Sequence, residues 1–160
     1  MRAQGAWLAL VLLIPATTAG QGPPIQRWQG EARLEVIAGR TTEWHVSAGA
    51  NAALGLYTRL ALLTGVGVRH LTGAWRRSAH VDALARFQLD PLLQFKYGAY
   101  VGGGGTLLAD DGAPARVRTL VVLGVEGAPT RGRWIAGFEL GLGGGARLGV
   151  TLRRARKQAR

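Results

Sequence analysis

The chain has 160 residues, which is enough for one domain and leaves little room for a second. It contains no cysteine, so a disulfide framework and a thiolate metal site are both excluded. The formal net charge is +11, but most of the cations are spread along predicted strands. They do not form the basic patch that nucleic-acid binding requires, and no nucleic-acid partner is expected.

Residues 1–19 have the pattern of a cleavable signal peptide. Arg2 precedes an apolar run at 6–14, and small residues lead to a plausible cleavage site after Ala19. A membrane-anchor helix is the alternative, but spanning requires roughly 20 apolar residues. The signal-peptide pattern predicts an exported protein. Residues 20–30 are expected to form a disordered lead-in to the folded domain.

From residue 31 onward the hydrophobic pattern has a period of two, which is typical of β-strands. No helical period competes with it. The predicted fold is therefore all-β, an eight-stranded antiparallel up-and-down barrel over 31–153. The predicted strands are 31–39, 44–51, 56–69, 79–89, 95–107, 117–126, 133–143 and 146–153.

The two faces of these strands differ sharply in composition. One face is apolar and free of charge, as in Leu62, Val121 and Leu140. The other face carries the charged residues, which are Glu31, Arg33, Glu35, Arg59, Arg69, Asp82, Arg86, Lys96, Arg116, Arg118, Glu126, Arg133, Glu139, Arg147 and Arg153. Glycines such as Gly65 and Gly124 also lie on the charged face.

A soluble sandwich or lipocalin-type barrel would turn the apolar face inward, whereas a transmembrane barrel would turn it toward lipid. The glycines favour the transmembrane barrel. A solvent-exposed face has no need to remove side chains, but a narrow eight-stranded lumen has room for few large ones. Aromatic residues also fall near the predicted rims: Phe87, Phe95, Tyr97 and Trp134 at one rim, Trp44 at the other.

The longer connections are predicted at 71–78 and 108–115, and short turns at 52–55 and 90–94. Long loops would lie outside the cell and short turns in the periplasm. Loops on a rigid scaffold often carry binding. The candidate contact residues are Trp75, Arg76, Arg77, Asp110 and Asp111.

With these features, the segment 31–153 resembles small bacterial outer-membrane β-barrels of the OmpA/OmpX type. The resemblance lies in the architecture, without a diagnostic motif. It implies an antiparallel barrel inserted into the outer membrane from the periplasm. Such proteins commonly end on an aromatic residue, whereas this chain ends RARKQAR.

Charges inside a narrow barrel must be paired or reach water, so we expect an ion-pair network that plugs the lumen. A narrow anion-selective path is the alternative. The residues predicted for this network are Arg33, Glu35, Arg59, Asp82, Arg86, Lys96, Arg118, Glu126, Glu139 and Arg147.

Other candidate sites are weak. His45, His80 and Asp82 could ligate a metal, but a hydrogen-bonded luminal network is the favoured interpretation. Ser47 has no placeable catalytic partners, and residues 102–105 (GGGG) lack the Lys-Ser/Thr of a phosphate loop. Residues 110–112 are predicted to form a turn rather than a calcium site. We expect neither a cofactor nor catalysis.

The predicted function is an integral outer-membrane barrel with a structural or surface-interaction role. Expected partners are outer-membrane lipid and a surface or periplasmic protein, and a monomer is expected. The basic tail 154–160 would be solvated or contact acidic groups. The alternative is a soluble periplasmic or secreted barrel that holds an apolar ligand against Leu62, Val121 and Leu140. The hypothesis that the protein is an enzyme would gain support only if His45, His80 and an acidic residue met at one rim of the barrel.

Overall fold

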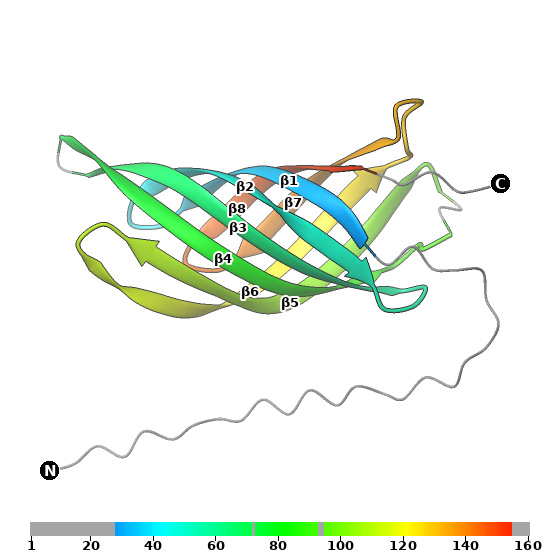
Figure 1. Cartoon of the computed structure of the whole chain (residues 1–160), viewed down its shortest axis with the longest axis horizontal. Coiled ribbons are helices and arrows are strands. Elements are labelled where there is room, and N and C mark those ends of the chain that lie inside the picture. Colours follow the sequence, from blue (N-terminus) through cyan, green and yellow to red (C-terminus); the bar gives the residue numbers. More distant parts are fainter. Residues whose placement is uncertain (1–27, 72, 93–94, 155–160) are drawn as a thin grey trace, which may run out of the picture.

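The computed structural model describes residues 28–71, 73–92 and 95–154. Eight antiparallel strands follow one another around a closed barrel, and the last strand pairs with the first (Figure 1). The strands are β1 (Trp28–Ala38), β2 (Thr42–Ala53), β3 (Thr58–Leu71), β4 (Ala74–Gln88), β5 (Tyr97–Asp110), β6 (Ala113–Gly127), β7 (Trp134–Leu142) and β8 (Ala146–Arg154). The predicted eight-stranded architecture is confirmed. Among these residues no helix is long and apolar enough to cross a membrane.

The barrel extends slightly beyond the predicted range 31–153. Strand β1 begins at Trp28, so residues 28–30 are strand rather than part of a disordered lead-in. Strand β8 ends at Arg154, which was predicted as the first residue of the tail. The predicted signal peptide, residues 20–27 and the remainder of the tail lie outside the described residues.

The barrel has two distinct ends (Figure 1). At the end called here the terminal end lie Trp28 and Arg154, with the β2–β3, β4–β5 and β6–β7 connections. The other four turns lie at the opposite, hairpin end, where the β3–β4 and β5–β6 hairpins project furthest.

The projecting hairpins correct the prediction of long loops at 71–78 and 108–115. Ladder pairing continues out to Leu71↔Ala74 and Asp110↔Ala113, so most of both segments is strand. Gly73 and Gly112 have φ of 80° and 78°. That backbone suits tight hairpin turns, in which glycine carries no steric cost.

Burial in this barrel is the reverse of that in a soluble protein. Apolar side chains face outward, and Leu62 and Val66 are 60% and 69% exposed. Charged side chains face inward, and Arg33 and Asp82 are 2% and 0% exposed. Isolated charges would not be stable in such a place, so the interior has to be built from paired groups.

Two inward glycines make room for large luminal side chains. A Cβ at Gly124 would overlap the ring of Tyr100 on the neighbouring strand β5. A Cβ at Gly65 would overlap the His80 imidazole and the Ser47 hydroxyl. Both glycines therefore leave space that neighbouring luminal side chains occupy.

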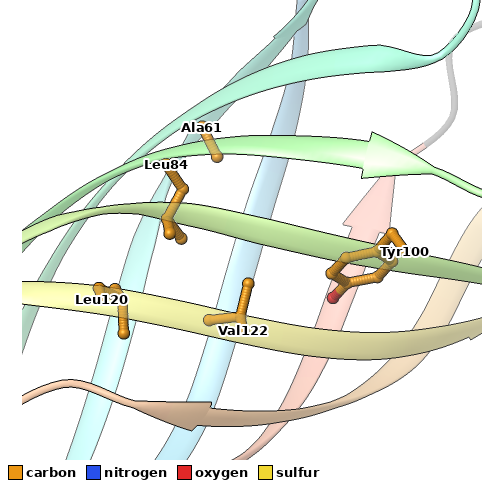
Figure 2. Close-up of a cluster of buried hydrophobic side chains, with 5 residues drawn as sticks. All are labelled: Ala61, Leu84, Tyr100, Leu120 and Val122. Carbon is orange, nitrogen blue, oxygen red and sulfur yellow. The ribbon is translucent and has the colours of Figure 1, made fainter.

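One wall of the lumen is apolar, contrary to the expectation that the inward face is charged or glycine. Figure 2 shows side chains from four adjacent strands meeting on this wall. They are Ala61, Leu84, Tyr100, Leu120 and Val122. Strands β3 to β6 therefore supply an apolar wall, and Arg86 of β4 lies over the ring of Tyr100 within it.

Exposed aromatic side chains gather at the terminal end, as the sequence predicted for one rim. They are Trp28, Tyr57, Phe87, Phe95, Tyr97 and Trp134, whereas Trp44 and Trp75 lie toward the hairpin end. The Lys96 ammonium lies 5.5 Å from the centroid of the Tyr97 ring, and the Arg154 guanidinium lies 5.8 Å from that of Trp134. Amphipathic rings next to cations are typical of a membrane–water interface.

Candidate functional site in the barrel lumen

The centre of the lumen is organised around the Arg33 guanidinium on β1. It donates to Glu139 on β7 at 2.9 Å, lies 3.0 Å from Glu35, and pairs closely with Asp82 on β4. The side chains of all four residues are at most 5% exposed. One cation thus ties together three strands that lie far apart in the sequence.

A second guanidinium, Arg86 on β4, lies beside the first. It donates to Glu31 at 2.7 Å and to Glu139 at 2.9 Å, and it also lies over the Tyr100 ring, 5.3 Å from the centroid. The amide of Asn51 donates to the same oxygen of Glu31 at 2.9 Å. Glu139 therefore bridges Arg33 and Arg86.

The third guanidinium, Arg147 on β8, completes the central network toward the hairpin end. It donates to Asp82 at 2.8 Å and to the Thr106 hydroxyl at 3.0 Å, and lies 3.5 Å from Glu35. Its Nε donates to the carbonyl of Gly143 at 2.9 Å. We call Arg33, Arg86, Arg147, Glu31, Glu35, Asp82 and Glu139 the central network.

A smaller cluster lies toward the terminal end. Glu126 on β6 pairs with Arg59 at 3.3 Å and closely with Arg153. Arg153 also reaches Gln29 at 3.5 Å, across the seam between β8 and β1. This cluster fills the lumen near the rim where the chain enters and leaves the barrel.

A chain of hydrogen-bonding groups leads from the central network toward the hairpin end. His80 Nε2 lies 3.1 Å from Glu35, the two Nδ1 atoms of His80 and His45 are 3.0 Å apart, and His45 Nε2 lies 3.1 Å from Glu43. Both ends of the chain are carboxylates, which only accept when ionised. The donor and acceptor roles of the ring nitrogens between these carboxylates depend on the tautomers of the two imidazoles.

The serines beside these imidazoles do not form a catalytic triad. Ser47 Oγ lies 3.1 Å from His80 Nε2, the same nitrogen that contacts Glu35. In a Ser–His–acid triad the hydroxyl and the acid lie on opposite ring nitrogens. Ser78 and Glu43 likewise share Nε2 of His45. The two histidines do meet acids, as the enzyme hypothesis required, but they are buried rather than at a rim.

A metal site at this place fits poorly. Glu35, His80 and Asp82 offer ligand atoms within 4.8 Å of one another. However, Asp82 Oδ2 already receives both Arg33 and Arg147, and Arg33 also contacts Glu35. A cation would have to displace or repel two guanidiniums. The donor set therefore suits an ion-pair network, and we assign no metal to it.

Above this network the lumen opens at the hairpin end into a cavity of about 510 Å³, which we call the vestibule. Its lining is Ile37, Gly39, Arg40, Thr41, Glu43, Arg69, Leu108, Arg116, Arg118 and Gly144. Arg69 lies 3.1 Å from Asp110 and 3.7 Å from Glu43, and Arg116 pairs closely with Asp110.

A second hollow, of about 790 Å³, lies on the outer wall. Its lining includes the outward side chains Leu34, Trp44, Val46 and Val66. It lies mainly on the apolar outer surface, although the inward-facing His45 and Ser78 also belong to its lining.

Comparison with solved structures identifies the fold. The N-terminal β-barrel domain of Pseudomonas aeruginosa OprF matches with a TM-score of 0.57 and 17% identity, over 81% of this chain and 98% of that one. A de novo designed transmembrane β-barrel matches with a TM-score of 0.55 and 13% identity, over 82% and 97%. The chain has the fold of a transmembrane β-barrel. No protein-family model matches the sequence, and neither does any curated protein.

Eight of the ten residues predicted for the luminal network of this transmembrane barrel take part in luminal ion pairs. Lys96 does not, because β5 begins only at Tyr97 and leaves Lys96 exposed in the preceding turn. Arg118 does not either, because it lies above the central network and lines the vestibule. The alternation of residues along a strand shows which face a side chain lies on, but not how deep it lies along the barrel axis.

The predicted loop contacts also need correction. Trp75, Arg76 and Arg77 are strand residues of β4, although all three are exposed. Asp110 is the last residue of β5, and its carboxylate is 4% exposed because it pairs with two arginines. Only Asp111 lies in an exposed turn.

Several luminal residues escaped the sequence analysis. Glu43 lies two residues before His45 and so shares its face, but the predicted strand began one residue too late to include it. Tyr100 donates its hydroxyl to Glu139 at 2.9 Å. Its inward position could be inferred from its alternation with Ala99 and Val101.

Proposed function

We propose that the protein is an integral outer-membrane barrel with a structural or surface-interaction role, and that its central network closes the lumen to solutes. The observation that carries this proposal is the reversed burial. The central network holds seven charged side chains that are at most 5% exposed, while the outer wall is apolar. In a soluble barrel with an interior apolar ligand, apolar side chains would line the interior and charged side chains would cover the outer wall.

The surface-interaction part rests on the projecting hairpins. By the orientation of similar barrels the hairpin end faces outside the cell, and the terminal end faces the periplasm. Trp75 is 67% exposed and stands beside the exposed Arg76 and Arg77 near the tip of the β3–β4 hairpin. Exposed aromatic and arginine side chains on a rigid support are the residues most often found at binding hot spots.

The location is tested by comparing boiled and unboiled samples of the envelope fraction on a denaturing gel. We expect an envelope-bound band that shifts on boiling, because the closed ladder resists detergent until it is heated. A soluble, unshifted protein in the periplasmic fraction would favour the soluble alternative instead.

Closure is tested by recording current across a planar bilayer that contains the purified barrel. The wild type is expected to give no discrete conductance steps, since eight strands leave room only for side chains. Arg147→Ala removes a central guanidinium and is expected to admit a small ion leak. Leu148→Ala, on the adjacent outward position, is the matched control. Stable anion-selective steps in the wild type would contradict closure and support the narrow-path alternative.

A further inference from the structure

The vestibule holds more positive than negative charge. Its lining has four guanidiniums and one carboxylate, Glu43, and the adjacent Asp110 supplies a second. Glu43 is shared between Arg69 and His45, and Asp110 between Arg69 and Arg116. Even if both acids are counted fully, two positive charges remain without a counterion.

The surplus can be assigned to two residues. Arg118 on β6 and Arg40 in the β1–β2 turn are exposed to solvent at the mouth of the vestibule and make no ion pair with any other described residue. In the central network, by contrast, each of the three guanidiniums contacts at least two carboxylates. The barrel therefore neutralises its interior charges but leaves arginines unmatched at the mouth.

The shape of the vestibule strengthens the effect of this charge. Ile37 and Leu108 form apolar parts of its wall. Arg118 lies opposite Thr106 in the β5–β6 register, and the Thr106 hydroxyl accepts from Arg147 of the central network, so the vestibule adjoins that network. A concave site with an excess of one charge sign and partly apolar walls focuses its field and attracts counterions.

We propose that the vestibule binds a small multivalent oxyanion of the phosphate type. Guanidinium groups match phosphate oxygens with paired N–H donors, which a single point charge does not. A volume of about 510 Å³ exceeds that of inorganic phosphate and accommodates a diphosphate or a phosphorylated small molecule. The site is independent of membrane location and of whether the lumen conducts.

The test is isothermal titration of the whole folded barrel, in a phosphate-free maltoside detergent at low salt, with pyrophosphate as the probe. We expect saturable binding at one site. Arg118→Gln should weaken it about tenfold, and adding Arg40→Gln should weaken it further. Neither substitution removes an ion pair, so both variants are expected to fold, which the gel shift on boiling verifies.

Two controls separate a built site from general attraction. Arg131→Gln removes an exposed arginine from the β6–β7 turn at the opposite end and should leave the affinity unchanged. Asp110→Asn removes the acid that occupies Arg69 and Arg116 and should tighten binding several-fold. The proposal is overturned if no saturable binding occurs, or if Arg131→Gln weakens binding as much as Arg118→Gln.

The phosphate could belong to a free solute or to a lipid headgroup, and a second titration distinguishes them. Glycerol 3-phosphate is compared with short-chain phosphatidic acid below its micellar concentration. Equal affinities would assign the site to free solutes. Tighter binding of the lipid, lost in Arg118→Gln, would assign it to a headgroup reaching over the rim. Failure of both ligands would refute the phosphate chemistry itself.

Discussion

Glu139 is the carboxylate that joins two guanidiniums of the central network, and Glu139→Gln tests the pairing on which the proposed closure rests. Its oxygens accept from Arg33 at 2.9 Å, from Arg86 at 2.9 Å and from the Tyr100 hydroxyl at 2.9 Å. Glutamine keeps the shape but removes the charge and places an amide N–H₂ against a guanidinium. Two buried cations would then lose a shared counterion.

The expected cost follows from the number and kind of the donors. Removing one partner of a buried charged pair costs about 3–5 kcal/mol. Tyr100→Phe deletes only the neutral hydroxyl bond to the same carboxylate and should cost about 1 kcal/mol. The difference between the unfolding free energies of these two variants separates the contribution of the charge from that of the neutral hydrogen bond.

Stability is measured by urea unfolding of the barrel in lipid vesicles, followed by tryptophan fluorescence and by the gel shift on boiling. A double variant with Arg86→Met completes a cycle, and it should cost less than the sum of the single changes because it removes a charge of each sign. If Glu139→Gln costs no more than Tyr100→Phe, the luminal charges are hydrated rather than paired, and the closure argument fails.

Two further perturbations address the packing and the lipid-facing wall. Gly124→Ala should lower the free energy of unfolding by about 1–3 kcal/mol, because the new methyl overlaps the Tyr100 ring. In the control Gly103→Ala the new methyl meets no atom within 4 Å, so its stability should be unchanged. The urea unfolding midpoints of the two variants are compared with that of the wild type. Leu62→Arg, on the outward face of β3, should lower the free energy of unfolding by about 2–4 kcal/mol in vesicles, and Leu56→Arg, in the β2–β3 turn, should lower it much less. Equal unfolding midpoints for the two arginine variants would show that the outer wall does not face lipid.

The sequence predicted the strands and their faces because alternation is a local property. The side chains of Leu62 and Leu63 leave opposite faces whatever the remainder of the chain does, and the structure has Leu62 exposed and Leu63 buried. The extended hairpins were missed because a turn needs only two residues. The glycines at 73 and 112 marked those turns, but the flanking polar residues resembled loops.

The partners inside the lumen could not be predicted in the same way. Arg33 meets Asp82 and Glu139 only because the strands are staggered and the sheet closes on itself. The apolar wall was missed for a related reason. Leu84 and Leu120 lie on the same face of their strands as charged residues, so alternation within one strand does not show that they gather into an apolar cluster with side chains of neighbouring strands.

The long sequence separation of the luminal ion pairs has a consequence for how the barrel forms. Arg33 is 106 residues from Glu139, and Arg147 is 112 residues from Glu35. A single hairpin or a half-assembled sheet entering the bilayer would carry these charges without most of their partners. Insertion and closure should therefore occur as one cooperative transition, slow because its contacts are so distant. Any factor that assists it must shelter the polar edge of the sheet until β8 reaches β1.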